Sequence, residues 1–450
     1  MSEVQQENKM GVMPEGKLLM NMSLPMMISM LVQALYNIVD TIFVSMVSED
    51  ALTAVSMAFP MQTLLIAVGA GTGVGVNSLL SKSLGEKNYE RANKTAMNGI
   101  FLYMISYLVS AVVGLVAVRP FYASQVKNAS MEIMDMGVQY LTIVMVFSFG
   151  LYAQFIFERL LQATGRTFFS MVSQLTGAII NIILDPIFIF GFKMGIAGAA
   201  VATVIGQIVG GVIGLVYNLK KNPDIQLGFR NFRPDGAIIG SIYRVGVPSI
   251  IMQSIGSVMT YGFNLILKEF SSTAVAVFGA YFKLQSFFFM PVFGLNNGLI
   301  PIVAYNYGAR NKKRMITTIK WGYLVAFCFM LLGFAVFMLI PDKLLFMFNA
   351  NEHMLTIGVP ALRIISVHFL IAWFGIVSSA SFQALGNGVY SLYVSAARQL
   401  VVLLPAAYIL AKVGGLSAIW WSFPVAEIMS AVISAICMML TYRKVIRPLK

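Results

Sequence analysis

The chain has 450 residues, of which 58% are hydrophobic and only 11% are charged, and its mean hydropathy is +0.80. Soluble domains carry about 45–50% apolar and about 25% charged residues, so this composition excludes an ordinary soluble protein and predicts a polytopic membrane protein. The net charge of +13 does not indicate nucleic-acid binding, because the Lys and Arg residues stand at the ends of apolar runs.

Apolar runs of spanning length follow one another along the whole chain. A spanning helix needs about 20 such residues. The runs fall near residues 18–47, 52–80, 95–118, 134–162, 167–191, 194–219, 242–268, 273–304, 316–341, 355–386, 389–412 and 416–441. We therefore predict an all-α protein of twelve transmembrane helices with no separate soluble domain.

The basic residues alternate between the two sides of this predicted bundle. One side, which holds both termini and the loop between the sixth and seventh helices, takes 21 of the 31 Lys and Arg residues. The other side takes 6, and the remaining 4 fall within or near helices. Because cytoplasmic loops are enriched in Lys and Arg, both termini are predicted to be cytoplasmic.

The first predicted helix carries an acid in mid-span, Asp40. Tyr36 and Asn37 precede it by four and three residues, so the three side chains share one helical face. An intramembrane charge costs about 2.5–3.5 kcal/mol even on a lenient scale and normally faces a bundle interior or a watered cavity. An Asp satisfied by hydrogen bonds between helices is the alternative. The cluster favours an ion site.

The fifth predicted helix contains the stretch NIILDP, residues 181–186. Its acid, Asp185, lies on the same helical face as Asn181. Pro186 has no backbone N–H to donate, which frees the Ile182 carbonyl one turn earlier. The stretch predicts a polar pocket inside the membrane, with a kink in the helix.

The second half contains few polar candidates. Gln253, Lys283 and Glu427 are candidate substrate contacts, and an intramembrane ion pair or a snorkelling side chain explains Glu427 equally well. Arg159, beside Glu158 near the end of the fourth helix, is predicted to lie at the membrane interface.

The two halves of the sequence repeat each other. LGEKNYERANKT (84–95) matches YGARNKKRMITT (307–318) at an offset of 223, and LQATG (161–165) matches FQALG (382–386) at an offset of 221. Pro25 matches Pro248, again at 223. Near-equal offsets indicate duplication. Six helices is an even number, so both copies share one orientation, as parallel transporter repeats do.

This duplication divides the chain into two similar halves, which differ in their intramembrane acids. The predicted parts are a tail (1–17), a six-helix lobe (18–219), a linker (220–240), a second six-helix lobe (241–441) and a second tail (442–450). The offsets place Phe263 opposite Asp40 and Leu404 opposite Asp185. Intramembrane acids therefore stand at these positions in the N-terminal half only.

Five motifs, taken in order, resemble the multidrug and toxic compound extrusion (MATE) family over essentially the whole chain. They are YNIVDTIFV (36–44), GEKNY (85–89), LQATG (161–165), NIILDP (181–186) and GIAGAAVAT (195–203). The resemblance implies a V-shaped pair of six-helix lobes that exports organic cations by antiport. It also implies a bacterial plasma-membrane protein, monomeric and without a cofactor.

The resemblance carries the family's N-lobe cation site onto four residues, Asp40, Asn181, Asp185 and Thr203. The coupling ion is then a proton, or a sodium ion held by Asp40, Asn181 and Asp185. For Thr203 a hydrogen bond to its own helix backbone is the alternative.

Two other functions stay open for the same sequence. A flippase of lipid-linked saccharides can use a similar helical arrangement, although it would need a basic cavity for phosphates. An intramembrane aspartyl protease would also use two aspartates, but the residues before them here are Val39 and Leu184 rather than the Tyr and Gly of such enzymes. The sequence favours a transporter that is not an enzyme.

Overall fold

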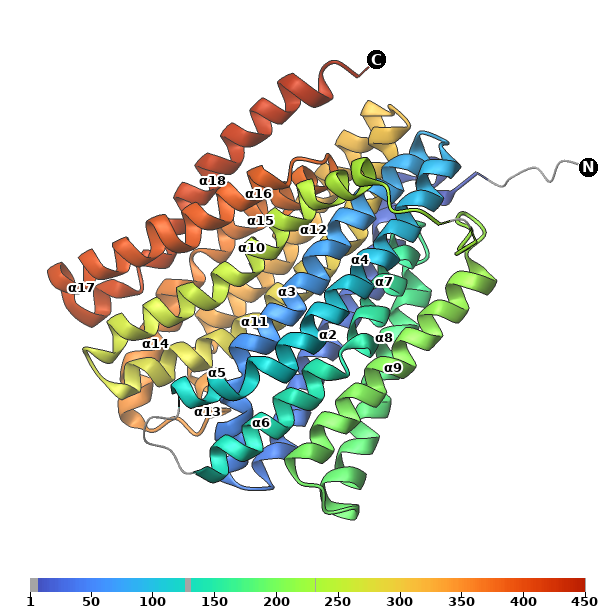
Figure 1. Ribbon diagram of the computed structural model, residues 1–450. Helices are drawn as coiled ribbons and strands as arrows, with labels where there is room; N and C mark the ends of the chain where they lie inside the picture. Colours follow the sequence, from blue (N-terminus) through green and yellow to red (C-terminus); the bar gives the residue numbers. More distant parts are fainter. Residues whose placement is uncertain (1–6, 126–130, 231, 450) are drawn as a thin grey trace, which may run out of the picture.

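The computed structural model describes residues 7–125, 131–230 and 232–449. Within these ranges the protein is helical and no strand occurs (Figure 1). The first six residues of the predicted tail 1–17 and Lys450 of the tail 442–450 lie outside the described residues.

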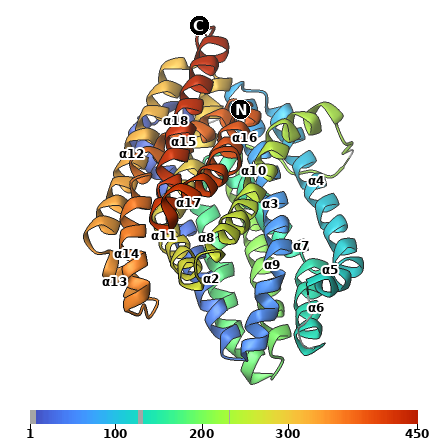
Figure 2. The same ribbon diagram turned by 90° about the vertical axis from the view of Figure 1, so that its left-hand side faces the viewer.

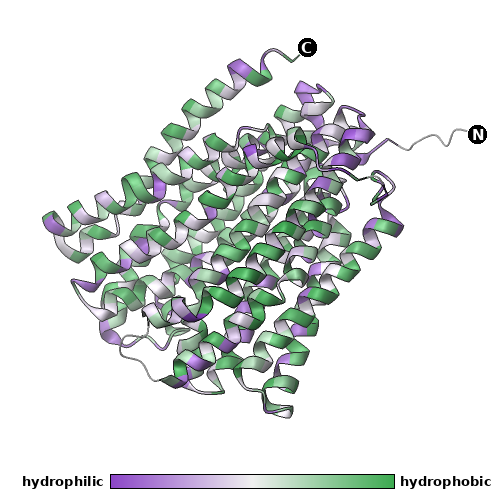
Figure 3. Ribbon diagram, viewed as in Figure 1, coloured by the Kyte–Doolittle hydropathy of each residue, from purple (hydrophilic) through white to green (hydrophobic). Residues whose placement is uncertain are grey.

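The described chain contains ten helices long and apolar enough to cross a membrane, and two bent helix pairs that bring the spans to as many as twelve. In the first half they are α2 (Glu15–Ser45), α3 (Glu49–Gly85), α4 (Tyr89–Val116), the pair α6 (Met131–Val146) and α7 (Phe149–Ala163), α8 (Thr167–Pro186) continued by the π-helix η1 (Ile187–Gly191), and α9 (Ile196–Lys221). In the second half they are α10 (Gly236–Lys268), α11 (Ser272–Gly308), α12 (Lys312–Leu339), the pair α14 (Glu352–Ser366) and α15 (Phe369–Ala384), the run α16 (Gly388–Ala396), η2 (Ala397–Leu403) and α17 (Leu404–Ile419), and α18 (Ser422–Thr441) continued by η3 (Tyr442–Ile446). Three short helices, α1 (Lys9–Val12), α5 (Val118–Gln125) and α13 (Pro341–Phe346), complete the chain. The twelve-helix prediction agrees with this architecture, and Figure 3 shows hydrophobic residues along the spans.

Corresponding helices of the two halves begin on corresponding caps. The Ser48 side chain accepts a hydrogen bond from the Ala51 amide at the start of α3, and Ser271 does the same at the start of α11. Asn88 caps α4 and Asn311 caps α12 in the same way. Short polar side chains cap helices because they satisfy amides that have no partner in the first turn. The repeat seen in the sequence is therefore also a repeat of local structure.

The fourth and tenth spans are broken rather than continuous. The runs 134–162 and 355–386 were each predicted as one helix, but α6 meets α7 at 43° and α14 meets α15 at 50°. At the second break Val367 and His368 donate to carbonyls three residues back, Ile364 and Ile365, instead of four. Such tight turns end a helix locally, and an apolar run gives no sign of them.

The two lobes meet mainly through four helices. α3 of the first lobe packs on α10, and α2 packs on α11 of the second lobe. Figure 2 shows the first lobe, in blue to green, beside the second, in yellow to red. At one end of the bundle α3 and α11 approach so closely that a Cβ at Gly85 would collide with the Tyr305 carbonyl oxygen, and a Cβ at Gly308 with the Lys82 carbonyl oxygen. We call Gly85 and Gly308 the glycine seam.

The glycine seam lies at the end that carries both termini, which we call the basic end (Figure 1). The N-terminal segment is fixed there between the lobes. Asn8 donates to the Thr164 carbonyl at 3.0 Å, and Asn306 of α11 donates to the Met10 carbonyl at 3.1 Å. Met10 is completely buried. Residues 8–13, predicted as part of a tail, thus form a strap across the two lobes.

Candidate functional site

The N-terminal lobe contains one fully buried and one half-buried aspartate whose buried carboxyl oxygens have no hydrogen-bond partner among the described residues. Asp185, in the last turn of α8, is 0% exposed, and neither of its carboxyl oxygens meets a donor among the described residues. Asp40 of α2 is near enough to interact with it electrostatically, and the Asp40 Oδ1 atom is also buried without a donor. The structure thus brings together the two acids that the sequence singled out.

Three polar side chains surround the acid pair. Asn181, one turn before Asp185, donates from Nδ2 to the Thr203 hydroxyl of α9 at 3.1 Å. The Tyr36 side chain of α2 lies on the opposite side of the same cavity from α9 and lines it together with Thr203. The Asn181 Oδ1 atom is buried and has no donor. Thr203 therefore bonds across helices, not merely to its own backbone.

Tyr140 of α6 is a further neighbour of the acids, and no sequence pattern indicated it. Its hydroxyl accepts a hydrogen bond from Gln62 of α3 at 3.0 Å, and it interacts electrostatically with both Asp40 and Asp185. Asn37, in contrast, is exposed on α2 and does not line the cavity described next. The predicted polar face of α2 is thus represented at the site by Tyr36.

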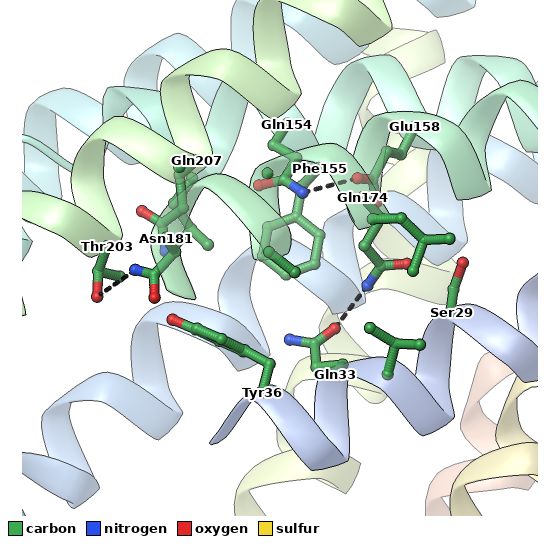
Figure 4. Close-up of a pocket in the computed structure, with 16 residues that line it drawn as sticks. Ser29, Gln33, Tyr36, Gln154, Phe155, Glu158, Gln174, Asn181, Thr203 and Gln207 are labelled. Atoms are coloured by element: carbon green, nitrogen blue, oxygen red, sulfur yellow. Dashed lines mark hydrogen bonds between the residues drawn. The ribbon is translucent and has the colours of Figure 1, made fainter. Parts of the chain in front are cut away.

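A cavity of about 80 Å³ adjoins the acid pair (Figure 4). Its polar lining comes from four helices and consists of Ser29, Gln33, Tyr36, Gln154, Glu158, Gln174, Asn181, Thr203 and Gln207. Gln174 donates to Gln33 at 2.6 Å, and Gln154 donates to Glu158 at 2.9 Å. Tyr36, Asn181 and Thr203 belong both to the cavity wall and to the surroundings of the acids.

Glu158 and Arg159 are both buried within the protein. Glu158 is 6% and Arg159 8% exposed, and the interfacial position expected for Arg159 stays a prediction. Successive residues of α7 point in different directions, so Glu158 faces the cavity while Arg159 faces the second lobe. There the Arg159 guanidinium donates to Asn297 of α11 at 3.0 Å. The polar spacing of Gln154 and Glu158, four residues apart, is the signal that could have identified this face.

The predicted residues of the C-terminal lobe do not form a comparable site. Glu427 is buried and pairs with Arg398 at 3.7 Å. Lys283 is exposed on α11, and Gln253 is half-buried on α10. None of the three candidates lines either cavity described here.

The oxygen atoms around Asp185 suit a proton or a hard cation as the ligand. In the described part of the chain no group of three or more His, Cys, Asp or Glu side chains could hold a metal ion. The two acids and Asn181 instead offer carboxylate and amide oxygens where α8 passes into the π-helix η1, and oxygen atoms are the ligands that hard cations prefer.

Comparison with known proteins gives a consistent result. The MatE family model matches residues 25–187 and again residues 248–409. The chain is 28% identical to "Multidrug export protein MepA" of Staphylococcus haemolyticus (strain JCSC1435), over 92% of this chain and 91% of that protein. It is 27% identical to MepA of Staphylococcus aureus (strain MRSA252), over 93% and 92%.

A solved structure is similar over nearly the whole chain. It is described as the outward-facing conformation of a multidrug resistance MATE family transporter of the MOP superfamily. The TM-score is 0.93 at 26% sequence identity, and the match covers 98% of this chain and 99% of that one.

Proposed function

The chain belongs to the MatE family, whose model it matches in both halves, and from this premise we propose that it exports organic cations in exchange for protons or sodium ions. Its relatives are named multidrug export proteins, which makes varied small molecules the expected cargo. Because the family consists of transporters, the protein is not an enzyme, and the alternative of an intramembrane protease is set aside.

The observation that carries the proposal is a set of four buried oxygen atoms without a hydrogen-bond donor. They are Asp40 Oδ1, both carboxyl oxygens of Asp185, and Asn181 Oδ1. All four are acceptors, and two of them belong to one fully buried carboxyl group, so a positively charged ligand is well suited to satisfy them together. Unpaired carboxylates are costly to bury, which favours uptake of a cation whenever this site is closed to water. A proton and a sodium ion both meet this requirement.

The adjoining cavity supports a cationic cargo. Among its lining residues there is one acid, Glu158, and no Lys or Arg. A flippase of phosphate-linked saccharides would need the opposite charge. The volume of about 80 Å³ is enough for several water molecules but well below the roughly 300–1,000 Å³ of drug pockets. The cavity must therefore widen to accept a drug.

Ion binding and cargo binding are coupled because the cavity and the acids share part of their surroundings. A cation at Asp185 would attract the Asn181 amide oxygen, and the Asn181 side chain is hydrogen-bonded to Thr203. Because Tyr36, Asn181 and Thr203 also line the cavity, this rearrangement reshapes the place where the cargo sits. Binding of the ion and binding of the cargo thereby oppose each other.

Alternating access requires that one end of the path be closed while the other is open. Here the glycine seam and the strap of residues 8–13 join the lobes at the basic end. With the basic end cytoplasmic, this state is closed toward the cytoplasm and faces outward. A similar solved structure is described as outward-facing, which supports this assignment.

The test is dye export, measured as uptake into everted vesicles, under a proton gradient and, separately, a sodium gradient. Asp185→Asn and Asp40→Asn should abolish gradient-driven efflux, because the neutral amide no longer requires a cation. Asp135→Asn, which changes an exposed acid of α6, serves as the matched control and should transport normally. Full gradient-driven efflux in both site variants would overturn the assignment of the coupling site.

A further inference from the structure

A second cavity lies on the outer side of the C-terminal lobe, between α12 and α18, where α18 continues into η3. Its volume is about 480 Å³. The apolar part of its wall comes from Ile319, Tyr323, Phe374, Ala435 and Met438. α12 and α18 are both long and apolar enough to span a membrane, so an open groove between them with a largely apolar wall is suited to contact lipid. An acyl chain is the ligand whose chemistry matches such a wall.

Two basic residues, Lys320 of α12 and Arg443 of η3, also line the groove. Both side chains are exposed, and neither forms an ion pair within the described part of the chain. The sequences of α12 and η3 contain no acid that could neutralise them. The groove therefore combines an apolar wall with an uncompensated positive charge.

Aromatic residues and a further hydrogen bond place this charge at the level of lipid headgroups. Trp321, next to Lys320, is 43% exposed, and Tyr442, next to Arg443, is 44% exposed, and exposed Trp and Tyr residues are enriched at membrane–water interfaces. Lys312 donates to the Arg447 carbonyl at 3.3 Å, which ties the start of α12 to the end of η3. The headgroup end of the groove is thus held by both helices, at the basic end.

We propose that this groove is a binding site for one phospholipid with an anionic headgroup, whose phosphate contacts Lys320 and Arg443 while an acyl chain lies between α12 and α18. Charge complementarity identifies the occupant. Basic pockets between spanning helices on the cytoplasmic side select anionic lipids, and the apolar wall excludes a water-soluble phosphate compound.

Native mass spectrometry of the full chain tests the proposal. The protein is released from micelles that contain equal amounts of phosphatidylglycerol and phosphatidylcholine, and the bound lipids are counted. The wild type should retain phosphatidylglycerol in preference. In the double variant Lys320→Ser with Arg443→Ser this preference should fall by about tenfold or more, since each basic residue adds attraction for anionic lipid.

Two further variants distinguish the groove from general surface charge. Lys220→Ser with Lys221→Ser removes two basic side chains from the end of α9, away from the groove, and should leave the preference unchanged. Ala435→Trp fills the groove and should reduce binding of both lipids. An equal loss of preference in the Lys220 and Lys221 variant, or none in the Lys320 and Arg443 variant, would overturn the proposal.

Discussion

Asp185 and Glu427 are both buried carboxyl groups in spanning helices, but they differ in what neutralises them. Glu427 has an internal partner, because the Arg398 guanidinium lies 3.7 Å from its Oε2 atom. Asp185 has no basic partner among the described residues and no hydrogen-bond donor. A mobile cation can therefore satisfy Asp185, whereas at Glu427 it would have to displace Arg398. This contrast supports coupling in the N-terminal lobe.

The Glu427 pair leads to a prediction about stability. Arg398→Gln leaves a buried carboxylate without a partner and should lower the free energy of unfolding by about 3 kcal/mol. Adding Glu427→Gln removes the unpaired carboxylate and should restore most of the lost free energy of unfolding. Thermal unfolding of the single and double variants in detergent measures both effects. A stable Arg398→Gln protein would show that the pair contributes little.

Glu158 leads to a prediction about substrate charge. It is the one Asp or Glu residue that lines the cavity beside Asp185. Glu158→Gln should weaken binding of a cationic dye about tenfold or more, since attraction between charges is strong where water is partly excluded. Binding of a neutral compound of similar size should change little. Fluorescence titration compares the two, with Glu132→Gln on the exposed face of α6 as the control.

The sequence could identify Asp40, Asn181, Asp185 and Thr203 because a polar residue in an apolar run is itself a signal. The structure places them together, and their role stays a prediction. Tyr140 could not be found in this way, because a tyrosine is common in membrane helices and only packing brings it to the acids. Glu158 was not singled out as a candidate, because an acid beside an arginine near the end of a span resembles an interfacial pair.

At the scale of elements, the close packing of α3 against α11 determines whether the basic end is closed. A methyl group at Gly85 or Gly308 would meet backbone atoms of the other helix, which cannot rotate away. Overpacking of this kind typically costs about 1–3 kcal/mol. The cost falls only on the conformation in which the two helices touch.

Gly85→Ala and Gly308→Ala should therefore shift the protein away from closure at the basic end, by about 5-fold to 150-fold in population. Spin labels at Tyr89→Cys and Lys313→Cys, with Cys328 and Cys437 replaced by Ser, would report a longer distance between α4 and α12. Gly279→Ala, on α11 where a Cβ meets nothing within 4 Å, is the control. An unchanged distance in the seam variants would show that the seam does not limit closure.

The boundaries of the helices show which features of the fold can be predicted from the sequence. Apolar length predicts each span, and Ser48, Asn88 and their counterparts mark where helices begin. The breaks within the fourth and tenth spans depend on local hydrogen bonding that hydropathy does not encode. Pro186 did indicate an irregular helix, and α8 does change to a π-helix immediately after it.

For the whole molecule, the uneven distribution of Lys and Arg predicts its orientation. Lys87 and Lys193 lie in exposed loops at opposite ends of the bundle, the first before α4 and the second before α9. Introduced cysteines at these positions, in a background without Cys328 and Cys437, can be treated with a membrane-impermeant maleimide in intact cells. Lys193→Cys should react and Lys87→Cys should not. The reverse pattern would place the basic end outside.

The glycine seam also bears on the origin of the molecule. Gly85 approaches Tyr305, and Lys82 approaches Gly308. Tyr305 lies 223 residues after Lys82, and Gly308 lies 223 residues after Gly85. Each contact thus joins the same two positions of the repeat, with the halves exchanged. This exchange is the defining property of an isologous interface between identical subunits. The contact at the glycine seam therefore has the symmetry of a twofold dimer of two six-span units, and in a single chain each unit can carry acids that the other lacks.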